Sequence, residues 1–310
     1  MERRSLPGVA REISSVTIGV DPPLVVPPAA DDRTIALLRR SRELGVTTFD
    51  VAGARFPQRA ERLIARAFPE PDPTVSAIVG RSVESLSRER AQDDSPPASS
   101  DREGALAASL EQSRRRLHPV PISVLEWEPE NEPPTADAGA GDAAVTKGEV
   151  PNGLLSAVRL SSQITELPKV ANAPALYSGA LSLLEPDLVT VFEGSDKSRA
   201  ARLLARDPFG SGRLDGSRFA ASAGLSGPET GPVDLRRLHE EFDPVLRLGF
   251  LTERRKRTLA QAAVQFVLHW PWVVSVVVPL PTPERIEEIL GFGGRPPISP
   301  EELSKLGFVK

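Results

Sequence analysis

Several charged residues in this sequence follow short apolar runs, a position that favours catalytic side chains in parallel α/β folds. Asp50 ends the run GVTTFD, and Glu128 follows the run ISVLEW. Arg55 lies shortly after Asp50, and Arg81 follows the run VSAIVG. Two carboxylates could exchange protons with a substrate while an arginine stabilises the negative charge that develops on it. The residue types therefore permit acid–base catalysis by Asp50 and Glu128, with Arg55 or Arg81 as the stabilising cation.

Such a site requires a sheet that brings the ends of these runs together. Short β-branched runs alternate with amphipathic stretches of about 10 to 15 residues, which is typical of βαβ units and a parallel sheet. The predicted strands are residues 15–20, 46–51, 74–79, 120–127, 155–161, 188–193, 200–206 and 273–278. The predicted helices are residues 32–44, 58–68, 101–117, 174–184, 257–269 and 282–290. Eight strands are enough to close a (β/α)8 TIM barrel, whose catalytic residues lie at the carboxyl ends of the strands.

Length and composition favour a single α/β barrel domain over residues 1–310. Hydrophobic residues make up 40% of the chain, which is enough for a sizeable core, and barrels of this length commonly form one domain. The sequence contains no cysteine, so disulfides and cysteine-based metal sites are excluded. We predict no metal site of any other kind.

Charge and hydropathy argue against two classes of partner. The net charge is −4 and the two signs are interspersed, so the sequence has no basic patch of the kind that binds nucleic acid. No segment approaches the roughly 18 apolar residues of a membrane helix. We therefore expect a cytoplasmic protein with neither a nucleic-acid nor a membrane partner.

Two of the predicted crossovers lack a normal covering helix. The sequence after the fourth predicted strand, PENEPPTADAGAGDAAVTKGEVPNG, is rich in Pro, Gly and acid and predicts a loop with at most a short helix. After the sixth predicted strand only EGSDKSR remains. Parallel strands without covering helices expose apolar surface. We expect a loop or a protein partner to cover these strands.

Four segments share their pattern with one known family. GVTTFDVA (residues 45–52) resembles a strand that reads G-V-x-x-F-D-T-A, and residues 109–129 are similar to a helix S-L-x-x-S-L-x-R-L with its following strand. ARDPFGSGRLDG (205–216) resembles A-x-x-P-L-x-x-G-x-L-x-G. Residues 258–290 resemble a helix, an eighth strand and a phosphate-binding turn. In order and spacing these segments resemble the aldo-keto reductase family, which implies a (β/α)8 barrel that reduces carbonyls with NADPH.

The resemblance implies a catalytic tetrad of Asp, Tyr, Lys and His, and this chain matches only the aspartate. Asp50 takes that place, and the family's tyrosine falls at Arg55. The lysine falls at Ile78, or in a looser alignment at Arg81, and the histidine falls at Trp127 or at its neighbour Glu128. Arginine does not exchange protons at neutral pH, and isoleucine carries no charge. The standard proton donor and its activating group are therefore both missing.

Other positions near the expected nicotinamide are also replaced. The family's amide-binding glutamine falls at Thr190, and the aromatic ring that stacks on nicotinamide falls at Arg206. We expect Trp127 to line the barrel mouth. The chain's only tyrosine, Tyr177, is expected to pack in the helix at 174–184.

The rest of the expected cofactor site is partly kept. The resemblance implies contacts to the carboxamide from two serines, to the pyrophosphate from the backbone of a glycine-rich turn, and to the 2′-phosphate from an arginine. These residues are Ser161, Ser162, Phe209, Gly210, Ser211, Gly212 and Arg285. The turn VPLPTPER carries prolines that lack N–H donors for a phosphate. We expect NADPH binding to be possible but weakened.

Three functions remain open. The first is a non-catalytic barrel that acts as a binding or assembly protein, with a small-molecule ligand at the barrel mouth or a protein partner. The second is an NADPH-dependent reductase with water or Glu128 as the proton donor. The third is a cofactor-free isomerase or lyase that uses Asp50 and Glu128. Alternatively, Asp50 forms only a structural ion pair with Arg55 or Arg81.

Overall fold

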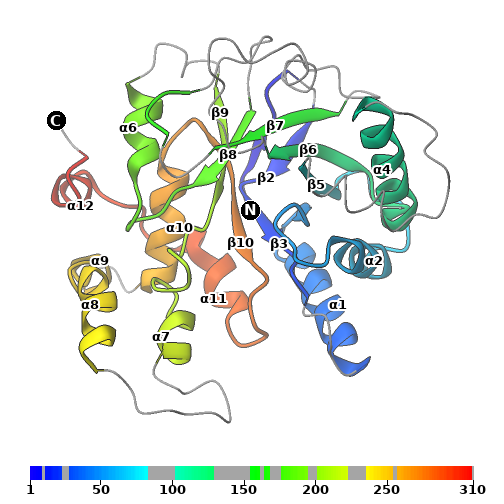
Figure 1. The fold of residues 1–310 in the computed structure, drawn as a ribbon. Coiled ribbons are helices and arrows are strands. Elements are labelled where there is room, and N and C mark those ends of the chain that lie inside the picture. The colour runs from blue at the N-terminus through cyan, green and yellow to red at the C-terminus, as the bar shows by residue number, and fades with distance from the viewer. Residues whose placement is uncertain are drawn as a thin grey trace.

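The computed structural model of the chain shows a barrel of parallel strands surrounded by helices (Figure 1). The described parts of the chain are residues 1–8, 11–22, 28–82, 102–128, 154–160, 164–167, 176–194, 201–222, 235–253 and 257–308.

Eight strands close the barrel in the order β10-β3-β4-β5-β6-β7-β8-β9, and each neighbouring pair is parallel. The strands are β3 (Val16–Gly19), β4 (Thr48–Asp50), β5 (Ser76–Ser82), β6 (Ile122–Glu128), β7 (Leu155–Arg159), β8 (Leu176–Ala180), β9 (Arg202–Arg206) and β10 (Val273–Pro279). The predicted TIM barrel is confirmed.

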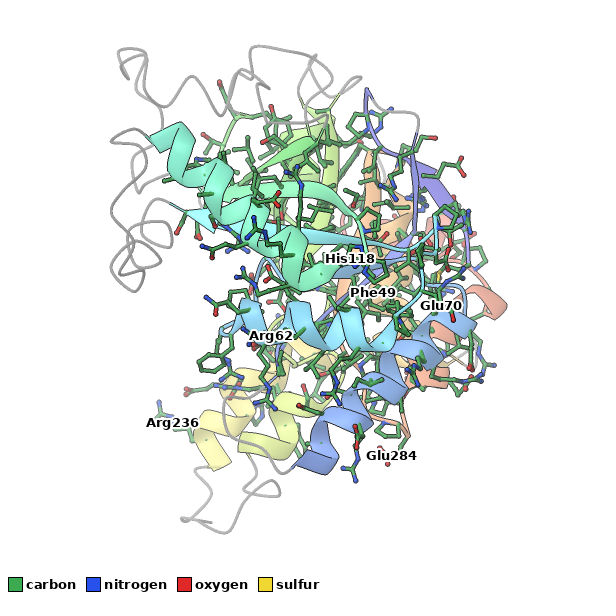
Figure 2. All side chains as sticks on the ribbon, turned by 90° about the vertical axis from the view of Figure 1, so that its right-hand side faces the viewer. Phe49, Arg62, Glu70, His118, Arg236 and Glu284 are labelled. Atoms are coloured by element: carbon green, nitrogen blue, oxygen red, sulfur yellow. The ribbon has the colours of Figure 1, made fainter. Side chains whose placement is uncertain are left out.

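The helices cover the outer face of the barrel. They are α1 (Pro28–Glu43), α2 (Pro57–Ala67), α4 (Arg102–Leu117), α6 (Asp187–Glu193), α7 (Ser217–Ser222), α8 (Leu235–Leu246), α9 (Phe250–Glu253), α10 (Leu259–His269), α11 (Ile286–Leu290) and α12 (Pro300–Lys305), with a 3-10 turn η3 (Gly291–Gly294). Figure 2 shows α1, α2 and α4 along one wall of the barrel. Phe49 contacts Phe68, with the ring centroids 4.9 Å apart.

Helix α10 begins where its sequence predicts. Thr258 accepts a hydrogen bond from the Gln261 N–H, and the Gln261 side chain accepts one from the Thr258 N–H. This capping box satisfies two backbone donors that the helix leaves without an intrahelical partner. The Gln261 amide also donates to the Glu288 carbonyl at 2.8 Å, which ties α10 to α11.

The secondary structure of two predicted elements is wrong, because one predicted helix is a strand and one predicted strand is a helix. Residues 174–184 were expected to form a helix, but Leu176–Ala180 is strand β8, which pairs with β7 and β9. Residues 188–193 were expected to form the sixth strand, but Asp187–Glu193 is helix α6, which follows Pro186 and has Asp187 in its first turn. Short apolar runs do not distinguish strand from buried helix, so pairing within the barrel decides.

The helix after the sixth barrel strand is short, as expected, because α6 has 7 residues. It nevertheless covers the barrel wall. The Phe192 ring stacks on Trp272 with centroids 4.4 Å apart and meets Tyr177 edge-on at 6.2 Å. The segment after the fourth strand, residues 129–153, lies outside the described residues.

The outward side chains of β6 to β9 are buried within the chain. The exposed fractions are 4% for Trp127, 7% for Val158, 3% for Tyr177 and 0% for Leu203. In the part that the structure describes, the chain therefore covers these strands itself. A protein partner at these strands stays a prediction.

The interior of the barrel has its own small hydrophobic core. It consists of Ile78, Val124, Ala157, Leu176, Leu204 and Val274, together with Leu6 and Ile13 from the N-terminal segment. That segment forms the antiparallel pair β1 (Arg3–Ser5) and β2 (Glu12–Ser14). The Arg4 guanidinium donates to the carbonyls of Val273 and Leu268 at 2.6 and 3.0 Å, which fastens this hairpin to the barrel. Polar side chains occupy the opposite, carboxyl end of the strands.

Candidate functional site

The barrel mouth carries charged side chains from four strands. β4 ends at Asp50, and β9 ends at Arg206. Glu126 lies two residues beyond Val124 on β6, so both side chains point into the barrel. Arg159 ends β7 on the same inward face as Ala157. The register places these residues one layer above the interior apolar core.

Arg206 crosses the mouth and binds two carboxylates. Its Nη1 and Nη2 donate to the two carboxylate oxygens of Asp50 at 2.8 and 3.1 Å. Its Nε and Nη2 donate to one oxygen of Glu126 at 2.9 and 2.5 Å. Such paired contacts are the strongest arrangement that arginine makes with carboxylates. Asp50 and Glu126 are each only 2% exposed, so the pairs lie out of water.

Two further residues complete this arrangement. Ser178 on β8 accepts a hydrogen bond from Arg206 Nε at 2.7 Å. Arg159 donates from Nε to the other oxygen of Glu126 at 2.7 Å, and its Nη1 lies 3.6 Å from Glu128. The Glu128 side chain is 55% exposed and stands at the rim. We call Asp50, Glu126, Arg159, Ser178 and Arg206 the mouth network.

The buried part of the mouth network is electrically balanced. Burial disfavours the charged form of Arg206, but Asp50 and Glu126 outweigh this effect and raise its pKa above the ordinary value. Arg206 therefore stays protonated and donates only hydrogen bonds. Two guanidinium groups, those of Arg159 and Arg206, oppose the two buried carboxylates of Asp50 and Glu126.

The predicted partners of Asp50 lie elsewhere. Arg55 stands on the rim, where its Nε and backbone N–H donate to Asp21 at 3.0 and 2.9 Å. Arg81 faces outward because its neighbour Gly80 occupies the inward position on β5, and its Nε donates to the Ser109 hydroxyl at 2.6 Å. The prediction that Asp50 forms an ion pair with Arg55 or Arg81 is wrong. The cation that binds Asp50 is Arg206.

Three other positions predicted from the resemblance lie outside the mouth network. Ile78 lies in the interior core, fully buried. Trp127 was expected to line the mouth, but it faces the helices because Glu126 takes the inward position. Thr190 was assigned to the sixth strand, but it lies on α6, and Ser178 is the inward polar residue of that strand.

Sequence reasoning missed Glu126, Arg159 and Ser178 as site residues. Glu126 is buried, whereas the predicted site residue Glu128 stands at the rim. The alternation in ISVLEWE was the available signal, since Val124 and Glu126 share a face. Arg159 could have been found by the rule that singled out Asp50, because it also ends its strand.

Comparison with known proteins is consistent with this barrel. The profile of the aldo/keto reductase family matches residues 27–307. The chain belongs to the aldo/keto reductase family. A search of curated protein sequences finds no significant match.

Two solved structures share the fold over nearly the whole of this aldo/keto reductase family member. The thermostable aldo-keto reductase Tm1743, in complex with the inhibitor epalrestat, is 17% identical, with a TM-score of 0.65 over 99% of this chain and 98% of that one. The glycerol dehydrogenase AKR11B4 from Gluconobacter oxydans is 16% identical, with a TM-score of 0.65 over 98% of this chain and 94% of that one. At these identities the similarity shows the fold.

Two of the family's catalytic residue types are missing from the barrel strands of this member, and its tyrosine faces outward. None of the eight strands contains histidine or lysine. Tyr177, the only tyrosine, lies on the outward face of β8, where burial raises its pKa to about 12. His118 follows α4 (Figure 2), and His269 ends α10.

The expected cofactor contacts fall into three groups. Ser161 and Ser162 lie outside the described residues. The turn from Phe209 to Gly212 follows β9, and Phe209 is buried in the core. Arg285 pairs with two carboxylates, because its Nη1 lies 3.5 Å from an Asp215 oxygen and its Nε 3.3 Å from Glu288. The arginine expected at a 2′-phosphate is thus already paired within the chain.

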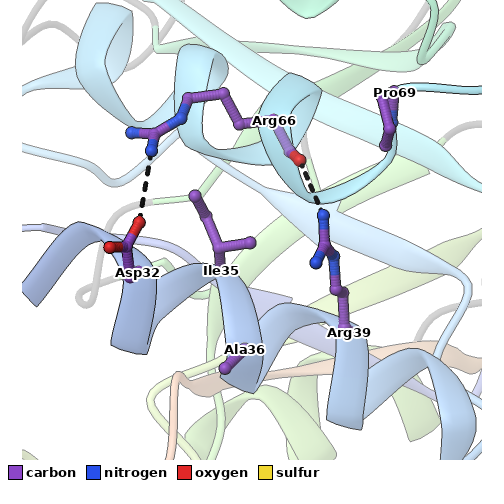
Figure 3. A pocket seen from close by; sticks show the side chains of 6 residues that line it. All are labelled: Asp32, Ile35, Ala36, Arg39, Arg66 and Pro69. Carbon is purple, nitrogen blue, oxygen red and sulfur yellow. Dashed lines mark hydrogen bonds and ion pairs between the residues drawn. The ribbon is translucent and has the colours of Figure 1, made fainter. Parts of the chain in front are cut away.

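A hollow lies on the outer wall of the barrel, between α1 and α2 (Figure 3). Its volume is about 520 Å³, and it is lined by Asp32, Ile35, Ala36, Arg39, Arg66 and Pro69. Arg66 pairs with Asp32 at 3.3 Å, and Arg39 donates to the Arg66 carbonyl at 3.2 Å. These contacts join the two helices, and the hollow is separate from the mouth network.

The described residues contain no group of three or more His, Asp or Glu side chains that could hold a metal ion. Among the helices with described placement, none is both long enough and apolar enough to span a bilayer.

Proposed function

We propose that this chain is a non-catalytic member of the aldo/keto reductase family that acts as a binding or assembly protein. The main support for the proposal is the set of contacts that Arg206 makes. Arg206 takes up both oxygens of Asp50 and shares Glu126 with Arg159, so the matched family aspartate serves a structural pair. A mouth held in this way favours a stable scaffold over proton transfer.

The proton that carbonyl reduction requires provides further support for the proposal. Carbonyl reduction needs a proton for the developing alkoxide as hydride arrives. The only tyrosine points away from the mouth, and the pKa of Arg206 is raised, so neither supplies that proton. Asp50 cannot activate another donor while both of its oxygens accept hydrogen bonds from Arg206.

The mouth also does not fit the reactive end of NADPH. The resemblance places a stacking aromatic ring at residue 206, and here that position holds a guanidinium fixed by Asp50, Glu126 and Ser178. The guanidinium carries a positive charge, which disfavours the cationic oxidised nicotinamide beside it.

A turnover assay tests the proposal. The purified chain is incubated with NADPH and a panel of aldehydes and ketones, and NADPH absorbance is followed. We expect consumption no faster than in a protein-free control. Turnover that Asp50→Asn abolishes, and that the surface variant Asp243→Asn leaves intact, would contradict the proposal.

A divergent NADPH-dependent reductase is the second candidate, because the family profile covers residues 27–307. Its proton donor would be water or Glu128, which is exposed at the rim and lies 3.6 Å from Arg159. In this case Glu128→Gln would reduce the rate by about 10² to 10⁴-fold. A cofactor-free acid–base reaction has less support, because Asp50 has no free carboxylate oxygen in the mouth network.

We propose that this binding protein takes its ligand at the barrel mouth. A small molecule at the mouth would meet the exposed rim residue Glu128 and the partly exposed Arg159 before the buried charges. A protein partner is the alternative, and native mass spectrometry of the chain isolated from its source would distinguish a bound small molecule from a bound protein.

A further inference from the structure

We propose that Asp207 closes the turn which the family resemblance assigns to the cofactor's pyrophosphate, so that the chain holds its own carboxylate where a phosphate would bind. Asp207 directly follows β9, and the turn continues through Gly210, Ser211 and Gly212. These residues lie outside the mouth network. The inference therefore stands apart from the loss of catalysis proposed above.

The backbone of this turn is unusual. Asp207 and Ser211 have φ of 49° and 57°, and Gly210 and Gly212 have φ of 55° and 83°. Residues with a side chain seldom adopt this left-handed conformation, although aspartate tolerates it better than most. Some interaction must hold Ser211 in place.

The carboxylate of Asp207 provides that interaction. Its two oxygens accept the Ser211 backbone N–H at 2.8 and 2.9 Å, and one of them also accepts the Ser211 hydroxyl at 3.2 Å. Backbone N–H groups in such turns commonly bind phosphate oxygens. Here the Asp207 carboxylate accepts the Ser211 N–H in place of a phosphate oxygen.

Three neighbouring backbone donors are also engaged. The N–H groups of Gly210, Arg213 and Leu214 donate to carbonyl oxygens of Asp207, Gly210 and Phe209 at 3.1, 3.3 and 2.9 Å. A phosphate entering this turn would have to displace contacts within the chain.

The surrounding charges act in the same direction. Arg213, which directly follows the turn, pairs with Glu185 at 2.9 Å, and Arg285 pairs with Asp215 and Glu288. The cations that could attract a phosphate are thus neutralised by the chain's own acids. Asp207 adds a negative charge that repels an incoming anion.

Calorimetry with ADP-ribose tests this inference. ADP-ribose carries the pyrophosphate but lacks nicotinamide, so its binding does not depend on access past Arg206. The variants are Asp207→Gly, which removes the carboxylate and suits the left-handed backbone, and Asp207→Asn, which keeps the side-chain shape and removes the charge. Asp243→Asn is the control with the same change in charge, at a surface carboxylate paired with Arg247.

We expect both Asp207 variants to bind ADP-ribose at least about tenfold more tightly than the wild type, because a charged competitor of the Ser211 N–H is gone. Asp243→Asn should bind as the wild type does. Equal affinity of the wild type and both folded Asp207 variants, including no detectable binding by any of them, would overturn the inference. Circular dichroism confirms folding, and Asp207→Asn provides the test if Asp207→Gly unfolds.

Discussion

A charge buried at the barrel mouth needs a partner close by, because an isolated carboxylate out of water is strongly disfavoured. Asp50 and Glu126 both meet this need through Arg206, and Glu126 is shared with Arg159. Removing one partner of such a network leaves the others buried without compensation. At the scale of single residues, Arg206 therefore decides both the stability and the chemistry of the mouth.

Replacing Arg206 with methionine should destabilise the fold by about 3 to 5 kcal/mol, since Asp50 and Glu126 lose their shared cation. Urea unfolding followed by circular dichroism measures this change. Arg247→Met is the matched control, because Arg247 pairs with Asp243 on the surface with 78% of its side chain exposed. That control should cost less than about 1 kcal/mol. Equal costs for the two variants would contradict the assigned role of Arg206.

Tyr177 provides a pH test of its burial. Its folded-state pKa is about 12 because burial disfavours the phenolate, against an ordinary value of 10.0. The folded state then keeps this proton to higher pH than the unfolded state does. Stability from Tyr177 is complete below pH 10 and is lost as pH rises towards 12. Because the chain has one tyrosine, near-ultraviolet phenolate absorbance reports it directly. Titration near 10 while the protein remains folded would show that Tyr177 is solvated.

The sequence predicted the position of Asp50 but not that its partner is Arg206. A β-branched run ending in an acid predicted a carboxylate at the end of a buried strand, and β4 ends at Asp50. Arg206 lies 156 residues further along the chain and meets Asp50 only because the barrel closes. The outward direction of Arg81 and Trp127 depends on the inward direction of Gly80 and Glu126, which strand parity would have given once the register was known.

At the scale of elements, β5 and the segment after β4 approach closely near the mouth. A Cβ atom added at Gly80 would lie 2.8 Å from Ala52 Cα, Cβ and O. Glycine thus lets the chain that follows Asp50 pass beside β5. The close approach helps to fix the strand end that carries the carboxylate.

Gly80→Ala should therefore destabilise the protein by about 1 to 3 kcal/mol, because backbone atoms of Ala52 must move. Gly291→Ala is the control, since nothing lies within 4 Å of its added Cβ and its φ is −79°. That control should stay within about 0.5 kcal/mol of the wild type. Thermal unfolding of both variants makes the comparison, and no loss of stability in Gly80→Ala would contradict the close approach.

The exchanged assignments of β8 and α6 show where element prediction fails. LYSGA and DLVTVFE are both short and apolar, and the β-branched Val189, Thr190 and Val191 favoured a strand. Pairing of β8 with β7 and β9 leaves α6 to cover the wall. Long periodic segments such as α10 were predictable because their pattern and cap agree.

At the scale of the whole molecule, the barrel was predictable because eight alternating units admit few closed arrangements. The family profile over residues 27–307 and the two reductase-like structures agree with that architecture. Function does not follow from the barrel, since one fold supports many activities. It depends on the mouth, where this chain places a salt-bridge network.

Calorimetric titration of NADPH into the wild-type chain tests the proposed role of the mouth network most directly. Calorimetry is preferred to tryptophan fluorescence because Trp127 faces away from the mouth. We predict no heat beyond that of dilution up to millimolar NADPH, because Arg206 and its carboxylates hold the nicotinamide position. Saturable binding of one NADPH per chain at micromolar concentration would contradict the account and would identify a working dinucleotide site.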